Sequence, residues 1–211
     1  MDTHKDQFTV EDFNKALVLL DKEIEHSTNL RKIVPITLLA VGGFVSVTYL
    51  HNRPATEDID YILDPQIQDQ KKIQEKLHDA IQKVAKSKKL SPEWANNNVA
   101  QFAVGDTRVP LFEESLAQNV VLWKGKNLVI YPVKWEWSLA RKLKRIGSTN
   151  REIDISDAVA TLYELNKRNG APLKRSVAKS WDEIVFSPIE DHVLDEVARR
   201  YKEQYGQDGM V

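Results

Sequence analysis

Two aspartates separated by a single residue are the side chains of this sequence best suited to binding a metal ion. Asp58 and Asp60 belong to the segment 58–63 (DIDYIL), whose apolar and β-branched residues predict a strand. Because side chains alternate along a strand, both carboxylates would face one side, about 6–7 Å apart, a spacing that one divalent cation can bridge. The alternative interpretation is a pair of solvated aspartates at a strand edge.

A glycine pair upstream of the aspartates adds a second element of a binding site. Gly42 and Gly43 follow the apolar segment 32–41 (KIVPITLLAV), which predicts a buried strand. Glycines at a strand end let the backbone approach a ligand, and the N-terminus of a following helix attracts phosphate. Ser46 could add a hydroxyl. With Mg²⁺ or Mn²⁺ held by the two aspartates, these features predict a nucleoside triphosphate site.

Other common nucleotide-binding and catalytic motifs do not occur in the sequence. It contains no G-x-G-x-x-G, no G-x-x-x-x-G-K-[ST] and no G-x-S-x-G. It also contains no cysteine, which excludes disulfides, thiolate zinc sites and cysteine nucleophiles. The aspartate pair and the glycine pair therefore carry the prediction.

The segment 42–63 resembles the GG-x-x-[LS]…R-x-x-T-x-D-[IL]-D segment of the nucleotidyltransferase superfamily, and is most similar to the AbiEii-type toxins and related nucleotidyltransferase-like proteins. The similarity covers about residues 30–168. The matching positions are Gly42, Gly43, Ser46, Arg53, Asp58 and Asp60, then Trp94 with Asn96 or Asn97, and finally Lys142, Asp154 and Asp157.

The resemblance implies an α+β fold with a nucleotidyltransferase-like (polymerase beta-like) mixed β-sheet core, flanking helices and an all-helical C-terminal part. It also implies Mg²⁺-dependent transfer of a nucleoside monophosphate from a nucleoside triphosphate donor to an acceptor. In known toxins of this branch the acceptor is RNA, such as tRNA ends. A neutralising protein partner is a further expectation, and no membrane is involved.

The resemblance also implies a role for each matching side chain. Asp58 and Asp60 would hold the metal, and the phosphates would be bound by Gly42, Gly43 and Ser46. Lys142 would neutralise charge on the transferred phosphate, and Asp154 would orient or deprotonate the acceptor. Arg53 would contact the substrate or hold its own loop to a carboxylate. The alternatives are an exposed lysine at 142 and, at Asp154 and Asp157, carboxylates stabilised by a helix N-terminus.

The sequence departs from polymerase-like members of the superfamily in one respect. Those proteins carry a third carboxylate on a later core strand, whereas the predicted strand 128–133 (LVIYPV) has none. Asp106, Glu113 and Glu114 are candidate substitutes in turn-like sequence. The toxin branch uses a lysine and a helical aspartate instead.

Hydrophobic periodicity predicts how these residues are positioned. Helices are expected over 9–27 and 65–89, strands over 32–41 and 59–63 and near 101–104, and a hairpin joining 119–123 to 128–133. After Lys134 only helices are predicted, over 135–146, 151–168, 172–185 and 188–205. We therefore expect a nucleotidyltransferase-like α/β core over 1–133 and a helical subdomain over 134–211 packed on it.

Charge and hydropathy restrict the partners and the location. The net charge is −1, but the stretch 134–151 holds six cationic side chains against Glu136 alone, which favours a nucleic-acid acceptor. The alternative is a solvated helix face balanced by acidic residues of the last helix, Glu190, Asp191, Asp195 and Glu196. The polar N-terminal segment 1–13 lacks a secretion signal, so we expect a cytoplasmic protein.

Two other functional classes stay open. The first is a catalytically degenerate nucleotidyltransferase-fold protein that acts as a nucleotide-binding or protein-interaction module. Exposed tryptophans among Trp123, Trp135, Trp137 and Trp181 would favour an interaction role. The second is a small-molecule nucleotidyltransferase, for which a narrow acceptor pocket is expected in place of an open basic groove.

Overall fold

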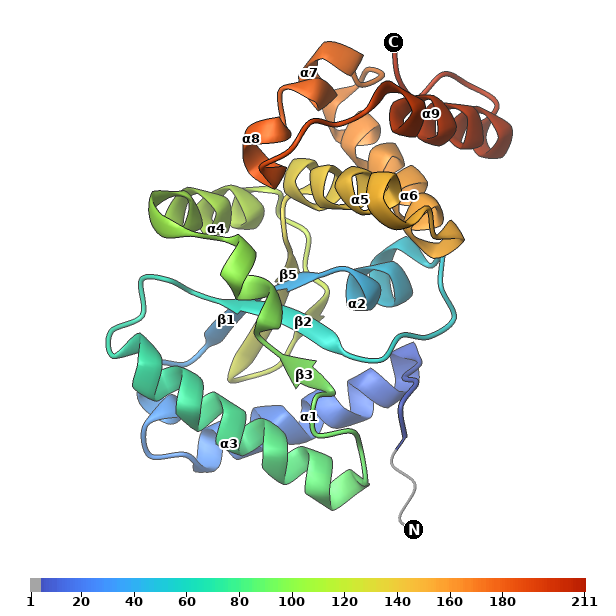
Figure 1. The fold of residues 1–211 in the computed structure, drawn as a ribbon. Coiled ribbons are helices and arrows are strands. Elements are labelled where there is room, and N and C mark those ends of the chain that lie inside the picture. The colour runs from blue at the N-terminus through green and yellow to red at the C-terminus, as the bar shows by residue number, and fades with distance from the viewer. Residues whose placement is uncertain (1–4) are drawn as a thin grey trace. The chain divides into compact units, whose positions relative to one another are not determined.

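The computed structural model describes residues 5–211, so the first four residues of the polar N-terminal segment lie outside the described part (Figure 1). The chain forms two units, Met1–Val133 and Lys134–Val211. The first unit contains α1 (Val10–His26), the 3₁₀ helix η1 (Leu30–Lys32), β1 (Ile36–Val41), α2 (Gly43–Val45), the π-helix η2 (Ser46–Leu50), β2 (Ile59–Leu63), α3 (Gln70–Lys88), β3 (Ala95–Asn96), the 3₁₀ helices η3 (Asn98–Phe102) and η4 (Gly105–Thr107), α4 (Arg108–Ala117), β4 (Trp123–Lys124) and β5 (Leu128–Pro132).

The first unit is built on a mixed five-stranded sheet in the order β3-β2-β1-β5-β4. The central strand β1 pairs antiparallel with β2 and parallel with β5, and the two edge strands are short. All residues of β1 except Thr37 and Val41 are buried, as expected for a central strand covered on both faces.

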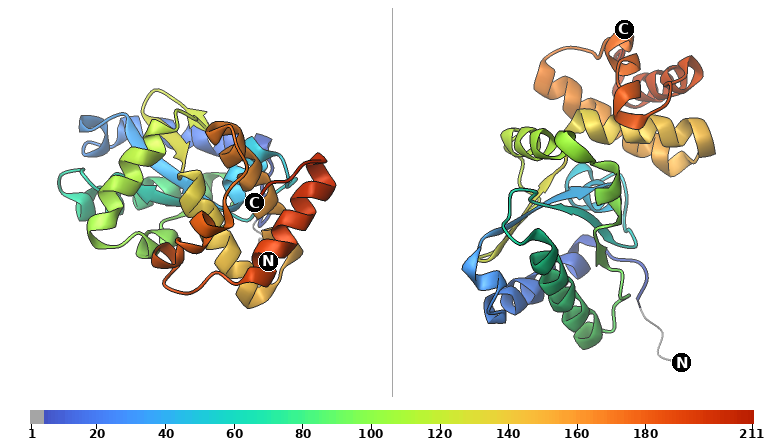
Figure 2. Two further views of the ribbon diagram at one scale, coloured as in Figure 1. Left: turned by 90° about the horizontal axis from the view of Figure 1, so that it is seen from above. Right: turned by 60° about the vertical axis from the view of Figure 1, so that its left-hand side comes forward.

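Amphipathic helices α1 and α3 cover the sheet and pack against each other. Both lie on the same side of the sheet in Figures 1 and 2. Each buries one stripe of apolar residues, spaced three or four apart, and exposes a charged face. The stripes are Phe13, Ala16, Leu17, Leu20 and Ile24 in α1, and Ile73, Leu77, Ile81 and Val84 in α3.

The regular elements of the second unit, Lys134–Val211, are helices, and one isolated bridge pairs Leu173 with Met210. The helices are α5 (Trp135–Thr149), α6 (Glu152–Asn169), α7 (Arg175–Lys179), α8 (Asp182–Val185) and α9 (Asp191–Tyr205). α5 packs on α6, α8 and α9, and α6 also packs on α9. The mixed sheet with helices, followed by a helical C-terminal part, confirms the predicted α+β class.

Four features of the structure differ from the prediction. Of the strand expected over 119–123, only Trp123 lies in a strand, β4. The strand expected near 101–104 is wrong, since Gln101 and Phe102 belong to the 3₁₀ helix η3 and Val104 precedes η4. Phe102 is 42% exposed and Val104 46% exposed. Helix α4 was not predicted, because Pro110 argues against a helix in this sequence. The proline lies in the first turn of α4, where a helix tolerates it. The helix expected over 172–185 is broken into α7 and α8. Over residues 5–211, no helix combines the length and apolarity that crossing a membrane requires.

The predicted start of α1 is confirmed as a capping box. The Thr9 hydroxyl accepts from the Asp12 N–H, and Asp12 accepts from the Thr9 N–H at 2.9 Å. Lys5 lies 2.7 Å from Asp12. Burial acts to raise the pKa of Asp12, but the hydrogen bonds from Lys5 and Thr9 outweigh it and lower the pKa to about 2.

Asp12→Asn should therefore lower the free energy of unfolding by about 1 kcal/mol at pH 7. The folded-state pKa lies below the unfolded value of about 3.9, so this stabilisation is complete above pH ~4 and is lost as pH falls toward 2. Urea unfolding of wild type and variant at pH 7 and at pH 3 measures the difference. Asp6→Asn, at an exposed neighbour, is the control, and an equal loss in both variants would contradict the prediction.

Candidate functional site

The Gly-Gly turn joins β1 to the short helix α2. Gly42 has φ +69° and ψ −128°, a backbone conformation that side-chain-bearing residues rarely adopt. Gly43 is required for a different reason: a Cβ there would lie 2.0 Å from the Thr56 hydroxyl oxygen. Thr56 is buried and pairs through its backbone with Phe8, so it cannot easily move away. Both glycines therefore have a structural requirement.

Gly43→Ala should lower the free energy of unfolding by about 1–3 kcal/mol, because the new methyl group overlaps Thr56. Thermal unfolding followed by circular dichroism measures the loss. Gly147→Ala is the matched control, since its Cβ would meet only Val193, at 3.4 Å, within a helix that favours alanine. A Gly43→Ala protein as stable as the Gly147→Ala protein would show that the turn can rearrange.

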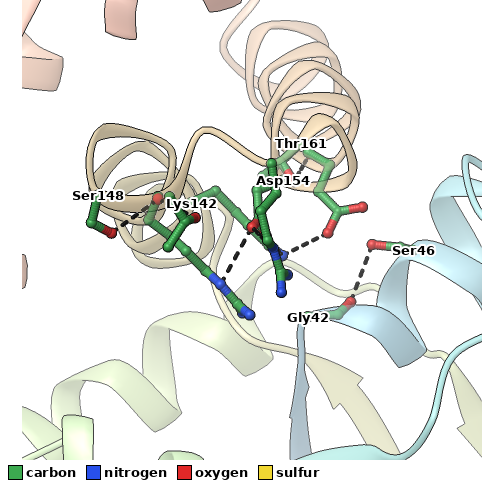
Figure 3. Close-up of polar contacts among 10 residues, drawn as sticks. Gly42, Ser46, Lys142, Ser148, Asp154 and Thr161 are labelled. Carbon is green, nitrogen blue, oxygen red and sulfur yellow. Dashed lines mark hydrogen bonds and ion pairs between the residues drawn. The ribbon is translucent and has the colours of Figure 1, made fainter.

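Ser46 is buried directly after the turn. Its hydroxyl donates to the Gly42 carbonyl at 3.2 Å, and its N–H donates to the same oxygen at 3.1 Å (Figure 3). The serine predicted to bind phosphate thus also closes the turn that follows β1. Arg53 is half-buried in the loop between η2 and Thr56.

The aspartate pair lies beside this turn. Asp60 is on β2 directly opposite Val41, the residue that precedes Gly42, in the antiparallel pairing with β1. Opposite Cα atoms in such a pair are only about 4.5–5.5 Å apart. Asp58 immediately precedes β2, and both aspartates are half-buried. The strand register therefore brings together the two groups that the sequence analysis assigned to one nucleoside triphosphate site.

Asn96 holds the Asp58 carboxylate in place from the neighbouring strand β3. Its amide nitrogen donates to Asp58 Oδ2 at 2.8 Å and lies 3.3 Å from the Glu93 carbonyl, and its Oδ1 accepts from the Asn98 N–H at 3.0 Å. The buried Trp94 indole donates to the Ile81 carbonyl at 3.2 Å and anchors the segment. The sequence analysis placed Asn96 in a family element but assigned it no role.

The electrostatics of Asp58 favour a cation. Burial raises the pKa of its carboxyl, the Asn96 hydrogen bond acts in the opposite direction, and Glu57 and Glu93 add to the increase. No lysine, arginine or histidine among residues 5–211 forms an ion pair with Asp58. In the same residues no group of three or more histidine, aspartate or glutamate side chains is placed to hold a metal. The alternative carboxylates Asp106 and Glu113 are exposed.

The remaining predicted residues form a buried charge cluster in the second unit. Lys142 of α5 lies 3.0 Å from Asp154 and 2.6 Å from Asp157, both on α6 (Figure 3). Asp154 also lies 2.8 Å from Arg151 and 3.3 Å from Arg145. The side chains of both aspartates are at most 1% exposed and that of Lys142 is 11% exposed. Neither an exposed lysine nor a simple helix-terminal carboxylate describes this arrangement.

The pKa of Asp154 is lowered in this cluster. Burial alone would raise it, but Lys142, Arg151 and Arg145 together outweigh burial. Asp154 therefore stays ionised near neutral pH and is surrounded by cations. This environment suits a residue that positions Lys142 better than one that accepts a proton.

The basic stretch 134–151 is not a uniform solvated stripe. Lys142, Arg145 and Arg151 pair within the cluster just described, and Lys144 donates to the Val185 carbonyl and the Ser187 hydroxyl. The acidic residues of the last helix, expected as its counterions, have other cationic partners. Asp191 pairs with Lys179, Asp195 with Arg175, Glu196 with Arg199, and Glu190 with His192 when that histidine is protonated.

The fold and the side chains define an α+β protein with a mixed five-stranded sheet, an aspartate pair beside a Gly-Gly turn, and a helical unit containing a buried lysine–aspartate cluster. A model of the family described as "Domain of unknown function (DUF7582)" matches residues 19–208, so the chain belongs to this family. Searches of curated proteins and of solved structures found no match.

Proposed function

We propose that the first unit has a nucleotidyltransferase-like core and that the protein is a Mg²⁺-dependent nucleotidyltransferase. The observation that carries this proposal is the register of β1 and β2, which sets Asp60 opposite the residue before Gly42. A phosphate-binding turn and a metal-binding carboxylate pair must be neighbours if one triphosphate is to contact both. Residues that are 16 positions apart in the sequence, Gly42 and Asp58, are brought together in this way.

The donor set fits a hard divalent cation. Asp58 and Asp60 supply carboxylate oxygens, which Mg²⁺ and Mn²⁺ prefer, and Asp58 lacks a cationic partner among the described residues. Mg²⁺ commonly binds through one or two carboxylates and completes its shell with water and substrate phosphates. When bound, the metal would supply positive charge that stabilises the triphosphate. Asn96 would keep the Asp58 carboxylate oriented for it.

The chain's own residues would bind and orient the donor. The backbone of Gly42 and Gly43 and the start of α2 would contact the phosphates, together with Ser46 and Arg53. The acceptor oxygen would bond to the α-phosphorus while the bond to the β-phosphate oxygen breaks, so pyrophosphate leaves and the hydroxyl proton passes to water. The expected acceptors are RNA or a small molecule.

The resemblance assigns Lys142 of the second unit the role of neutralising charge on a phosphate. An ammonium group has three N–H donors, and two of those of Lys142 are directed at Asp154 and Asp157. The third is left for an anion. Because Asp154 is buried and its pKa is lowered, we assign it the positioning of Lys142 and not proton abstraction from the acceptor.

A degenerate nucleotide-binding module is the second candidate. It is favoured by the same cluster, since two buried carboxylates already balance the charge of Lys142. A role in protein interaction through tryptophans has less support, because Trp135, Trp137 and Trp181 are buried and Trp123 is half-buried.

The test is to incubate the protein with each α-labelled nucleoside triphosphate, Mg²⁺ or Mn²⁺, and cellular RNA or a panel of small hydroxyl compounds. Transfer of label that EDTA abolishes would support the enzyme. Metal-dependent triphosphate binding without transfer to any acceptor would favour the degenerate module. Absence of both binding and transfer would refute both candidates.

A further inference from the structure

A polar cleft lies in the first unit, at the opposite end of β2 from Asp58. It has a volume of about 460 Å³ and is open to solvent on one side. Its floor is formed by Ile62 and Leu63, and by the strand rise Leu63 is about 16 Å from Asp58. Its walls come from the first turns of α3 and from η3, which packs on β2. Neither Asp58 nor Asp60 lines the cleft, although Ile62 is only two residues from Asp60.

Arg108 lines this cleft and is held in place by the backbone. Its Nε–H donates to the Ala103 carbonyl at 2.7 Å, and one Nη2–H donates to the Ala100 carbonyl at 2.7 Å. These bonds use one edge of the guanidinium. The other edge, with the Nη1 hydrogens and the second Nη2 hydrogen, has no partner among residues 5–211. A pre-oriented guanidinium with an unoccupied edge is suited to binding an oxyanion through two hydrogen bonds.

The other charged group of the cleft has the same sign. Lys71 stands in the first turn of α3 and forms no ion pair with any described residue. No aspartate or glutamate of the described residues lines the cleft. The whole chain, in contrast, carries 31 acidic and 30 basic residues. The positive end of the 19-residue helix α3 adds to the local potential. The cleft therefore favours an anion.

The uncharged lining consists of amides and a few apolar groups. The amides belong to Gln70, Gln74, Asn97, Asn98 and Gln101. Gln74 is fixed by donating to the hydroxyl of buried Tyr61 at 2.7 Å, and the start of η3 is fixed where the Asn98 N–H bonds to Asn96. Amides offer both donors and acceptors, so they match a ligand that carries hydrogen-bonding groups besides its charge.

We propose that this cleft binds a small organic anion, with its oxyanion group on Arg108 and Lys71 and its uncharged polar part among the amides. The volume falls in the range of small-molecule sites. Phosphate and carboxylate groups share this chemistry. The site does not depend on the proposed nucleotidyl transfer.

The test is calorimetric titration of the full chain, in EDTA, with inorganic phosphate, a nucleoside monophosphate and a dicarboxylate such as succinate. EDTA prevents metal-dependent binding at the aspartate pair. We expect saturable one-to-one binding of at least one organic anion. Preference for the monophosphate would identify a phosphoryl ligand, and preference for succinate a carboxylate ligand.

Arg108→Gln and Lys71→Gln should each weaken this binding by about tenfold or more. Lys71 is exposed and forms no hydrogen bond or ion pair within residues 5–211, so its variant tests the site without disturbing η3. Lys72→Gln, at the next exposed position of α3, should leave the affinity unchanged. The proposal is overturned if neither organic anion binds saturably or if Lys72→Gln weakens binding as much as Lys71→Gln.

Discussion

Asp58→Asn and Asp60→Asn should each reduce nucleotidyl transfer by about 100-fold or more while leaving the protein folded. Each substitution removes a carboxylate oxygen proposed to bind the metal, so the charge of the triphosphate loses its counterion. For Asp58 the loss of charge should not destabilise the protein, because burial raises the pKa of this carboxyl and an asparagine can still accept from Asn96. We therefore expect the variants to lose nucleotidyl transfer and to keep the stability of the wild type.

The measurements are the transfer rate with labelled triphosphate and, independently, Mn²⁺ binding followed by electron paramagnetic resonance. Glu57→Gln is the matched control, because Glu57 is an exposed acidic neighbour that lies outside the proposed donor set. Metal affinity retained in Asp58→Asn and Asp60→Asn would remove the aspartate pair from the proposal. Loss of transfer accompanied by unfolding would show that these residues act through stability.

Lys142→Met should lower the free energy of unfolding by about 3–5 kcal/mol, the expected effect of removing one partner from a buried ion pair. The methionine fills a similar volume but deprives Asp154 and Asp157 of the cation that they share. Urea unfolding at pH 7 measures the loss. Lys167→Met is the control, since the Lys167 side chain is 63% exposed and its pairing with Glu164 contributes at most about 1 kcal/mol.

The pH dependence provides a check on the mechanism. The pKa of Asp154 is lowered in the folded protein, so its stabilisation is present above the unfolded pKa and is lost as pH falls through the folded value. The difference in free energy of unfolding between wild type and Lys142→Met should therefore become smaller at acidic pH. Adding Asp154→Asn and Asp157→Asn to Lys142→Met should recover part of the loss at pH 7. Equal stability of Lys142→Met and Lys167→Met would contradict the importance of the cluster.

Much of this structure can be read from local sequence. The strand Ile59–Leu63 and the helix that begins after Thr9 have the predicted bounds because their side-chain period and capping residues act over a few positions. The proximity of the aspartates to each other also follows from their spacing. The spacing of Asp154 and Asp157 likewise predicts that they share a helix face, because residues three apart on a helix are neighbours.

Contacts between distant segments could not be predicted in this way. Asn96 reaches Asp58 across 38 residues, and Asp60 faces Val41 only because β2 pairs antiparallel with β1 in one register. A shift of one residue would turn the aspartates to the other face of the sheet. The periodicity of a short segment does not indicate which remote segment it will pair with.

The pattern of two glycines followed by two aspartates thus leads, from sequence alone, to the proposed chemistry and to the side chains that would carry it. The tertiary structure adds the strand register that joins them, the asparagine that orients Asp58, and the burial that pairs Lys142 with two carboxylates. It also leaves the outer edge of Arg108 without a partner among residues 5–211, which no residue pattern indicates. The reason is physical: spacing along the chain determines local geometry, whereas desolvation and partner choice depend on which remote segments pack together.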